Sequence, residues 1–141
     1  MKRKASAEWN GSLKEGKGNI STESGVLAKT QYSFDTRFES GIGTNPEELV
    51  AAAHAACYSM QLSALLGKAG LVPDTIATTA VITFENLEQG WTVTESHLEV
   101  KARIPGSTPE SFAELAQDAK TGCLMSRILK TAITLDAKLV A

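Results

Sequence analysis

The 141-residue sequence is poor in aromatic residues, in histidine and in cysteine, and it carries little net charge. Aromatic side chains make up only 6% of the chain, so we expect a core built mainly from Ala, Val, Leu and Ile. The 14 basic and 16 acidic residues nearly cancel, and the longest basic cluster is the run at positions 2–4. Nucleic-acid binding needs a basic stripe that displaces counterions, so we expect no nucleic-acid partner.

The sequence also lacks a long apolar run and an export signal. The least polar stretch, Leu49–Leu66, is interrupted by polar side chains and is too short and too polar for a membrane span. The N-terminal basic residues are not followed by an apolar segment, so we expect no signal peptide and a cytoplasmic location. A stable disulfide is disfavoured in the reducing cytosol, where cysteine pairs are more often redox-active or metal-bound. The only two cysteines, Cys57 and Cys123, are therefore the first candidates for chemistry.

No repeat, linker or low-complexity tract divides the chain, and its length suits one domain over residues 1–141. Strands are predicted at 5–9, 18–24, 31–38, 75–85, 90–104 and 133–139. Within 90–104 the apolar positions change parity, from Trp91 and Val93 to Leu98 and Val100. A one-residue shift moves side chains to the other face of a sheet, so a bulge is predicted near 94–97.

Two predicted helices share the same entry chemistry. Thr44-Asn45-Pro46-Glu47 fits an N-cap Thr44, a proline in the first turn and Glu47 at the third position of a capping box. Ser107-Thr108-Pro109-Glu110 opens the second helix, which Gly122 interrupts before a shorter helix that begins at Cys123 or Leu124. The order βββ–α–ββ–αα–β indicates an α+β domain with a mainly antiparallel sheet.

The segment Ala51–Cys57 has almost no large side chain on any face of its helix. Small side chains let helix backbones approach closely, so this pattern favours burial against another helix or a second copy of the chain. We therefore expect a dimer. The alternative is that the alanines reflect helix propensity alone.

Residues suited to thiol-based peroxide reduction are present. This chemistry needs a stabilised thiolate and a second thiol that traps the sulfenic acid as a disulfide. Cys57 lies in the first predicted helix, and Cys123 lies at the start of a short one, where the helix dipole favours thiolate character. Arg37 lies just upstream of the first helix, and Glu47 is suited to hold its guanidinium in a bidentate pair.

Each of these residues has a structural alternative. A free cysteine usually packs as a small hydrophobe, Glu47 can be a capping residue only, and Arg37 can be a solvated surface charge. One straight helix would also place Glu47 and Cys57 about 15 Å apart along its axis. Either the helix bends after its first turn, or a site that uses both residues is completed by a second chain.

Two further functions stay open from the residues alone. His54 and Cys57 share a helix face, and with His97 and Cys123 they would form a Cys2His2 zinc set, although the spacing matches no compact zinc motif. A redox sensor would form the same disulfide but would oxidise once instead of turning over.

The segment Gly43–Cys57 resembles the first-cysteine signature of the OsmC/Ohr family, the osmotically inducible and organic-hydroperoxide-resistance proteins. Thr22–Leu27 and Tyr32–Glu39 are more similar to the OsmC branch of this family. Gly122-Cys123, followed by Ser126, resembles the second signature. The similarity extends over essentially the whole chain.

This resemblance implies mainly antiparallel sheets wrapped around long central helices, in an intertwined homodimer with active sites at the subunit interface. It implies reduction of organic hydroperoxides or hydrogen peroxide, with no cofactor or metal. Cys57 is then the peroxidatic thiol, Cys123 resolves it, Arg37 activates the thiolate and Glu47 pairs with that arginine. An external dithiol, lipoyl-type in this family, would reduce the disulfide. Leu124 stands where the family commonly has proline. Unlike proline, leucine has a backbone N–H at the helix start.

Overall fold

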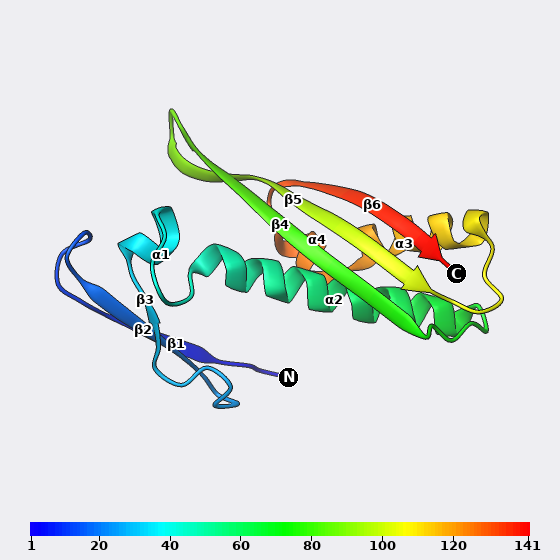
Figure 1. Cartoon of the computed structure of the whole chain (residues 1–141), viewed down its shortest axis with the longest axis horizontal. Coiled ribbons are helices and arrows are strands. Elements are labelled where there is room, and N and C mark those ends of the chain that lie inside the picture. Colours follow the sequence, from blue (N-terminus) through cyan, green and yellow to red (C-terminus); the bar gives the residue numbers. More distant parts are fainter. The chain divides into compact units, whose positions relative to one another are not determined.

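A computed structural model of the chain describes all residues, 1–141, and divides them into two compact units, Met1–Leu49 and Val50–Ala141. Each unit contains its own three-stranded sheet (Figure 1). The strands and helices follow one another in the predicted order, with one additional short helix in the first unit. The α+β class is therefore confirmed. The expectation of a single domain stays a prediction.

The first unit is a small antiparallel sheet followed by a short helix. Strands β1 (Ala5–Asn10), β2 (Lys17–Thr22) and β3 (Thr30–Tyr32) pair in chain order. The prediction that the third strand continues to residue 38 is wrong, because Phe34–Phe38 forms helix α1.

A capping box explains why α1 replaces the predicted strand. The Thr36 N–H donates to Ser33 Oγ at 3.3 Å, and the Ser33 N–H donates to Thr36 Oγ1 at 2.8 Å. These two bonds satisfy backbone donors at the helix start, which a strand would leave to a neighbouring strand. The helix places Arg37 in its last turn.

Helix α2 (Pro46–Lys68) is one unbroken element of 23 residues. Its N-cap is Asn45 and not the predicted Thr44, because Asn45 Oδ1 accepts the Glu48 N–H at 2.8 Å. The third helical position is therefore Glu48, whose Oε1 accepts from Thr44 Oγ1 at 2.6 Å. This one-residue correction means that Glu47 has no capping role.

The second unit is built on strands β4 (Thr75–Leu87), β5 (Gly90–Arg103) and β6 (Ala132–Val140). Strands β4 and β5 form a long antiparallel hairpin, whereas β6 runs parallel to β5 on its other side. The sheets are thus mainly antiparallel, as predicted. The parallel β6 reaches its place through a connection that contains two helices.

A bulge in β5 determines which of its residues face the core. Thr83 pairs with Glu95, whereas the next residue of β4, Phe84, pairs with Val93, so Thr94 is the additional residue. The predicted bulge near 94–97 is confirmed. Beyond it, the buried positions of the strand are the even-numbered ones: Ser96, Leu98, Val100 and Ala102.

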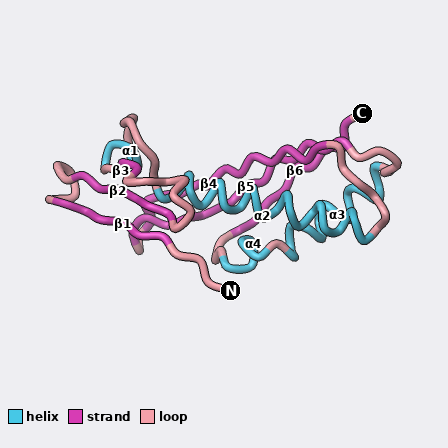
Figure 2. The backbone as a smooth tube through the Cα atoms, turned by 90° about the horizontal axis from the view of Figure 1, so that it is seen from below, coloured by secondary structure: helices cyan, strands magenta, loops and turns pink.

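Helices α3 (Pro109–Gly122) and α4 (Leu124–Ile128) connect β5 to β6. Thr108 is the N-cap of α3, and its hydroxyl accepts the Ser111 N–H at 3.2 Å; by analogy with a Thr44 cap the sequence would have placed the cap one residue earlier, at Ser107. Figure 2 shows the helices along one face of the β4–β5–β6 sheet. The predominantly aliphatic core between them contains Tyr58, Leu62, Leu66, Leu98, Val100, Ala102, Ile104, Phe112, Ala116, Ala119 and Cys123.

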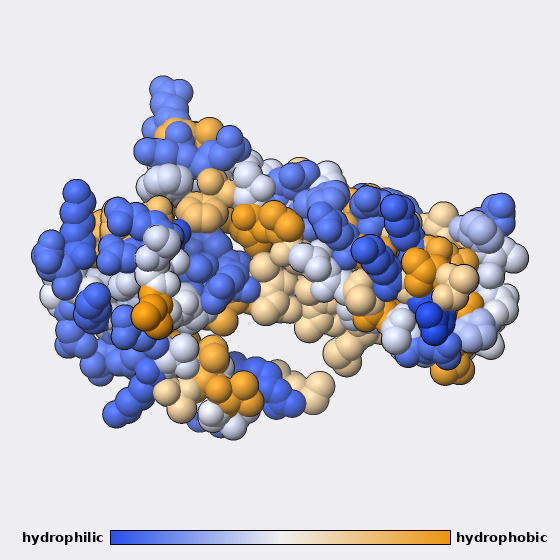
Figure 3. All heavy atoms as spheres, in the orientation of Figure 1, coloured by the Kyte–Doolittle hydropathy of each residue, from blue (hydrophilic) through white to orange (hydrophobic).

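The two faces of α2 have different environments. One face, with His54, Tyr58, Leu62 and Leu66 at every fourth position, is buried. On the other face the side chains of Ala53, Ala56, Met60 and Ala64 are exposed, and Met60 is 76% exposed. No charged residue lies between Glu48 and Lys68, and in Figure 3 tan spheres show moderately hydrophobic residues in the middle of the molecule, where this helix runs.

By length and composition, α2 is the one helix of the chain that could cross a membrane. This is weak evidence, because the core helix of a soluble protein passes the same test. The His54–Leu66 face of α2 packs into the core of the second unit.

Candidate active site

The two cysteines are neighbours in the second unit, and neither forms a disulfide. Cys123 is fully buried at the junction where α3 ends and α4 begins. Cys57 lies half-buried on α2 and packs against the core cluster that contains Cys123. One thiol is thus accessible from outside the unit, and the other is held beside it in the core.

Burial raises the pKa of the Cys123 thiol above its ordinary value. The backbone N–H and the hydroxyl of Ser126 interact with the sulfur and oppose this rise in the pKa, whereas the contact with Cys57 adds to it. The expectation that the helix dipole gives Cys123 thiolate character is therefore wrong. Helix α4 has only five residues, and desolvation outweighs the effect of its N-terminus.

A buried histidine connects three elements beside this pair. His54 of α2 is fully buried, with Nδ1 2.6 Å from Ser96 Oγ on β5 and Nε2 2.7 Å from Ser126 Oγ on α4. Burial lowers the pKa of His54, so the ring is neutral at neutral pH. Ser126 therefore contacts both the histidine and the Cys123 sulfur.

The zinc set considered from the sequence does not form. Both ring nitrogens of His54 are occupied by serine hydroxyls, and His97 Nδ1 lies 2.6 Å from Thr134 Oγ1. Nowhere along the chain do three or more His, Cys, Asp or Glu side chains gather closely enough to hold a metal ion.

Arg37 and Glu47 form a bidentate ion pair within the first unit. Arg37 Nε lies 2.9 and 3.2 Å from the two carboxylate oxygens, and Nη2 lies 2.7 Å from Oε1. The Glu47 side chain is 11% exposed, and the guanidinium carbon lies 5.1 Å from the centre of the Phe38 ring. The predicted pairing is confirmed: Glu47 holds the guanidinium of Arg37, whose side chain remains 39% exposed.

The ion pair borders an apolar pocket of about 250 Å³. Trp9 and Tyr32 pack with ring centres 5.5 Å apart over Gly18, where a Cβ would collide with both rings. Although aromatic residues are scarce in the chain, four of them line this pocket, whose full lining is Trp9, Leu13, Tyr32, Ser33, Phe34, Arg37, Phe38 and Pro46.

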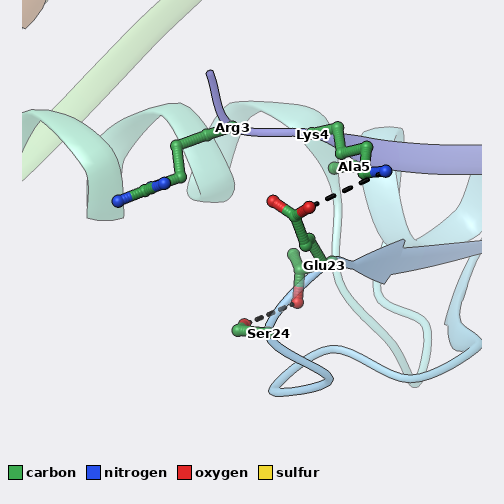
Figure 4. A pocket seen from close by; sticks show the side chains of 6 residues that line it. Arg3, Lys4, Ala5, Glu23 and Ser24 are labelled. Carbon is green, nitrogen blue, oxygen red and sulfur yellow. Dashed lines mark hydrogen bonds and ion pairs between the residues drawn. The ribbon is translucent and has the colours of Figure 1, made fainter. Parts of the chain in front are cut away.

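A larger cavity, about 600 Å³, lies in the same unit at the start of β1 (Figure 4). The Lys4 amine lies 3.7 Å from Glu23 Oε1 across it, and Thr22 Oγ1 lies 3.2 Å from Ser24 Oγ. Both members of the ion pair are well exposed. The lining contains no cysteine, histidine or aromatic residue, so we assign no chemistry to this cavity.

The candidate residues thus form two groups. Arg37 and Glu47 belong to the first unit, and Cys57 and Cys123 belong to the second. Glu47 and Cys57 are ten residues apart on the unbroken helix α2, about 15 Å along its axis. No break interrupts α2 between these two residues. An arginine–thiolate contact stays a prediction.

Two hydroxyl residues of the site were not recognised from the sequence as carrying chemistry. The sequence points to Ser126 only through the family resemblance, although it follows Cys123 by three residues at the start of a short helix. No pattern in the sequence points to Ser96. Ser96 is a polar residue at a position of β5 that faces the core. That position can be recognised only once the bulge at Thr94 is taken into account.

Residues 39–138 match the family described as OsmC-like protein. The chain belongs to the OsmC-like family. It is 48% identical over 137 residues to the peroxiredoxin OsmC of Escherichia coli K12, covering 97% of this chain and 96% of that protein. The peroxiredoxin OsmC of Shigella flexneri matches with the same identity and coverage. The family resemblance predicted from the cysteine signatures is confirmed.

Solved structures of this family share the fold. An OsmC-like protein of unknown function from Vibrio cholerae has a TM-score of 0.79 at 15% identity, covering 98% of this chain and 99% of that chain. The organic hydroperoxide resistance protein OhrB of Bacillus subtilis has a TM-score of 0.71 at 21% identity, covering 96% and 98%. The family match and the curated relatives support a peroxidase or hydroperoxide-resistance role for this OsmC-like chain.

Proposed function

We propose that this OsmC-like chain is a cytoplasmic, cysteine-based peroxidase that reduces organic hydroperoxides, and also hydrogen peroxide, and so protects the cell against oxidative stress. The observation that carries the proposal is the contact between a half-buried thiol, Cys57, and a fully buried one, Cys123. An accessible thiol can meet a peroxide, and a second thiol beside it can trap the product.

In the first step the Cys57 thiolate attacks the terminal oxygen of the peroxide. An S–O bond forms, the O–O bond breaks, and the leaving alkoxide takes a proton to become an alcohol. Cys123 keeps its proton in this step, because burial and the neighbouring Cys57 both raise the pKa of its thiol. Only Cys57 therefore presents a nucleophile to the substrate.

In the second step Cys123 attacks the Cys57 sulfenic acid. The disulfide forms, the S–O bond breaks, and hydroxide leaves with the thiol proton as water. Oxidation removes the negative charge of Cys57, and with it one cause of the raised pKa of Cys123. An external dithiol, which we propose to be lipoyl-type, then reduces the disulfide and is itself oxidised to a cyclic disulfide.

The pocket beside Arg37 is our proposed site for the organic part of the substrate. Its volume of about 250 Å³ and its aromatic and aliphatic walls suit an alkyl or aryl group better than water. Glu47 occupies Nε and Nη2 of the arginine, while Nη1 has no hydrogen-bond partner within the chain. Nη1 is then available to the peroxide oxygen that develops negative charge.

We further propose that the active site is completed in a homodimer. Helix α2 is unbroken between Glu47 and Cys57, which argues against a site that uses both from one chain. The uncharged outer face of α2, with Ala53, Ala56 and Met60, is suited to close packing against a second copy. Cys57 of one chain would then meet the Arg37 pocket of its partner.

A turnover assay tests the proposed activity. Purified protein is given cumene hydroperoxide or hydrogen peroxide with dithiothreitol, and then with dihydrolipoamide. We expect multiple turnovers, a higher kcat/KM for cumene hydroperoxide, and complete loss in Cys57→Ser. Peroxide consumption that stops after one equivalent would identify a redox sensor instead, and unchanged turnover in Cys57→Ser would refute the assignment.

Mixed dimers test the shared site. The variants Cys57→Ser and Arg37→Ala are each expected to be inactive or nearly so. When the two are unfolded together and refolded, a shared site gives each heterodimer one intact centre, which restores about a quarter of wild-type activity for random pairing. If each chain carries its own complete site, mixing restores nothing.

A further inference from the structure

Beside the two cysteines, a buried chain of side chains spans three elements. It runs from Ser96 on β5 through His54 on α2 to Ser126 on α4 and ends at the Cys123 sulfur. The two histidine contacts are short, 2.6 and 2.7 Å, and both His54 and Ser96 are fully buried. The peroxidase steps described above use none of these three polar side chains.

The hydrogen-bond donors of these side chains are few enough to assign one by one. The Ser126 hydroxyl carries one proton, and it has two neighbours, His54 Nε2 and the Cys123 sulfur. If Nε2 carries the ring proton, Ser126 Oγ accepts it and its own proton is free for the sulfur. The second ring nitrogen, Nδ1, then accepts from the Ser96 hydroxyl.

The opposite polarity satisfies the same atoms. A protonated Cys123 donates to Ser126 Oγ, Ser126 donates to Nε2, and Nδ1–H donates to Ser96. The imidazole is neutral in both arrangements and changes only its tautomer. No buried polar side-chain atom of the protein is without a hydrogen-bond partner. This row of hydrogen-bonded side chains can therefore accommodate both the thiol and the thiolate of Cys123 without placing a charge on the buried ring.

We propose that His54 is a positioning residue for the resolving step: with its proton on Nε2 it holds the Ser126 hydroxyl against the Cys123 sulfur and directs the hydroxyl proton at that sulfur. This inference rests on the proposed function of Cys123. In the resolving step the proton of Cys123 leaves in water with the sulfenic oxygen, and the S–S bond forms. The side chains of Ser96, His54 and Ser126 contribute no atom and no electron to the products. They stabilise the sulfur at the moment when it is most negative.

Single-turnover experiments separate this step from peroxide reduction. Reduced protein is mixed with one equivalent of cumene hydroperoxide and quenched at intervals, and mass spectrometry counts the Cys57 sulfenic acid, trapped with dimedone, and the disulfide. In His54→Leu we expect the sulfenic acid to form at the wild-type rate and the disulfide to form about tenfold more slowly or worse, the effect of a lost hydrogen bond to a charged group.

Companion variants keep the test decisive if His54→Leu fails to fold. Ser126→Ala removes the donor itself and should slow the disulfide step to a similar extent. His54→Gln, which keeps one donor and one acceptor, should recover most of the rate. The matched control is His97→Leu, which removes the other histidine, bonded to Thr134, and should leave both steps unchanged.

Non-additivity and tautomer state supply readouts that a packing role would not change. If His54 acts through Ser126, the double variant His54→Leu with Ser126→Ala is no slower than Ser126→Ala alone. Nitrogen chemical shifts of His54 should report opposite tautomers in the reduced protein at low and high pH. Wild-type disulfide rates in both His54→Leu and Ser126→Ala would overturn the inference. A wild-type protein that forms neither sulfenic acid nor disulfide would instead refute the proposed function.

Discussion

Arg37 meets Glu47 side-on: its Nε and Nη2 atoms lie 2.9 and 2.7 Å from Glu47 Oε1. The carboxylate comes from the second residue of α2, and the guanidinium comes from the last turn of α1. Because Asn45 and Glu48 cap the long helix, Glu47 is left to orient the arginine. The pair fixes the plane of the guanidinium at the border of the aromatic pocket.

Neutralising Glu47 should therefore impair catalysis more than stability. In Glu47→Gln the guanidinium loses a charge-assisted bond worth about 1.5–3 kcal/mol, and we expect kcat/KM for cumene hydroperoxide to fall about 10- to 100-fold. Glu48→Gln is the matched control, because it changes the neighbouring acid, which bonds Thr44 and not Arg37. Equal losses in both variants would contradict an orienting role for Glu47.

The two thiols should differ in their reaction with iodoacetamide near neutral pH. Only thiolate reacts, and Cys123 is both fully buried and raised in pKa, so we expect it to be alkylated at least about tenfold more slowly than Cys57. Peptide mass spectrometry of samples taken over time measures both rates. In denaturant the two rates should converge, and faster labelling of Cys123 in the folded protein would contradict this order.

Acid should weaken the fold through His54. Its pKa is lowered from 6.5 in the folded protein, so below that pH the unfolded chain binds a proton that the folded one does not. The stabilisation is complete above pH 6.5 and is lost as the pH falls, by up to about 1.4 kcal/mol per pH unit. Urea unfolding between about pH 7 and 5 should show a shallower slope in His54→Gln than in the wild type.

A charge on the outer face of α2 should prevent self-association. Met60 is 76% exposed and Val72, in the loop after the helix, is 78% exposed. We expect Met60→Lys to weaken the dimer at least about tenfold in sedimentation velocity, because its ammonium would be buried in the interface. The Val72→Lys variant places the same charge outside the proposed interface and should remain dimeric. A dimer of unchanged affinity in Met60→Lys would contradict the use of this face.

Replacing Gly18 should damage the aromatic pocket. A methyl group at this position collides with the rings of Trp9 and Tyr32, so we expect Gly18→Ala to lower the free energy of unfolding by about 1–3 kcal/mol and to raise KM for cumene hydroperoxide. The control is Gly67→Ala, where the added methyl meets open space and should be neutral or stabilising by about 0.5–1 kcal/mol. Urea denaturation and steady-state kinetics provide the two measurements.

Most elements of the fold could be predicted because their signals are local. The helix start at Pro109, the break at Gly122 and the change of parity before Leu98 each depend on a few neighbouring residues. Helix α1 is an exception. It is stabilised by the reciprocal bonding of Ser33 and Thr36, but the alternation of apolar residues in this segment is also typical of a strand, and the sequence therefore predicts a strand.

The sequence could predict most of the candidate residues of the site, but not the contacts between residues that lie far apart along the chain. The Arg37–Glu47 pair follows from residue chemistry, and the structure supplies its geometry. The contact of His54 with Ser126 joins residues 72 positions apart, and no local pattern encodes such a distance. The raised pKa of Cys123 also depends on burial by the whole core, which outweighs the helix start on which the sequence-based expectation relied.

The bulge at Thr94 divides the long β4–β5 hairpin into two parts with different constraints. On one side, register is tied to the buried Ser96 and to the contact it makes with His54. On the other side, the rings of Phe84 and Trp91 pack with their centres 5.6 Å apart, and neither residue touches His54 in the pairing that sets this register. A change in the length of the hairpin tip would therefore leave the serine that faces the histidine in place. The bulge separates the length of the hairpin from the geometry of the thiol site.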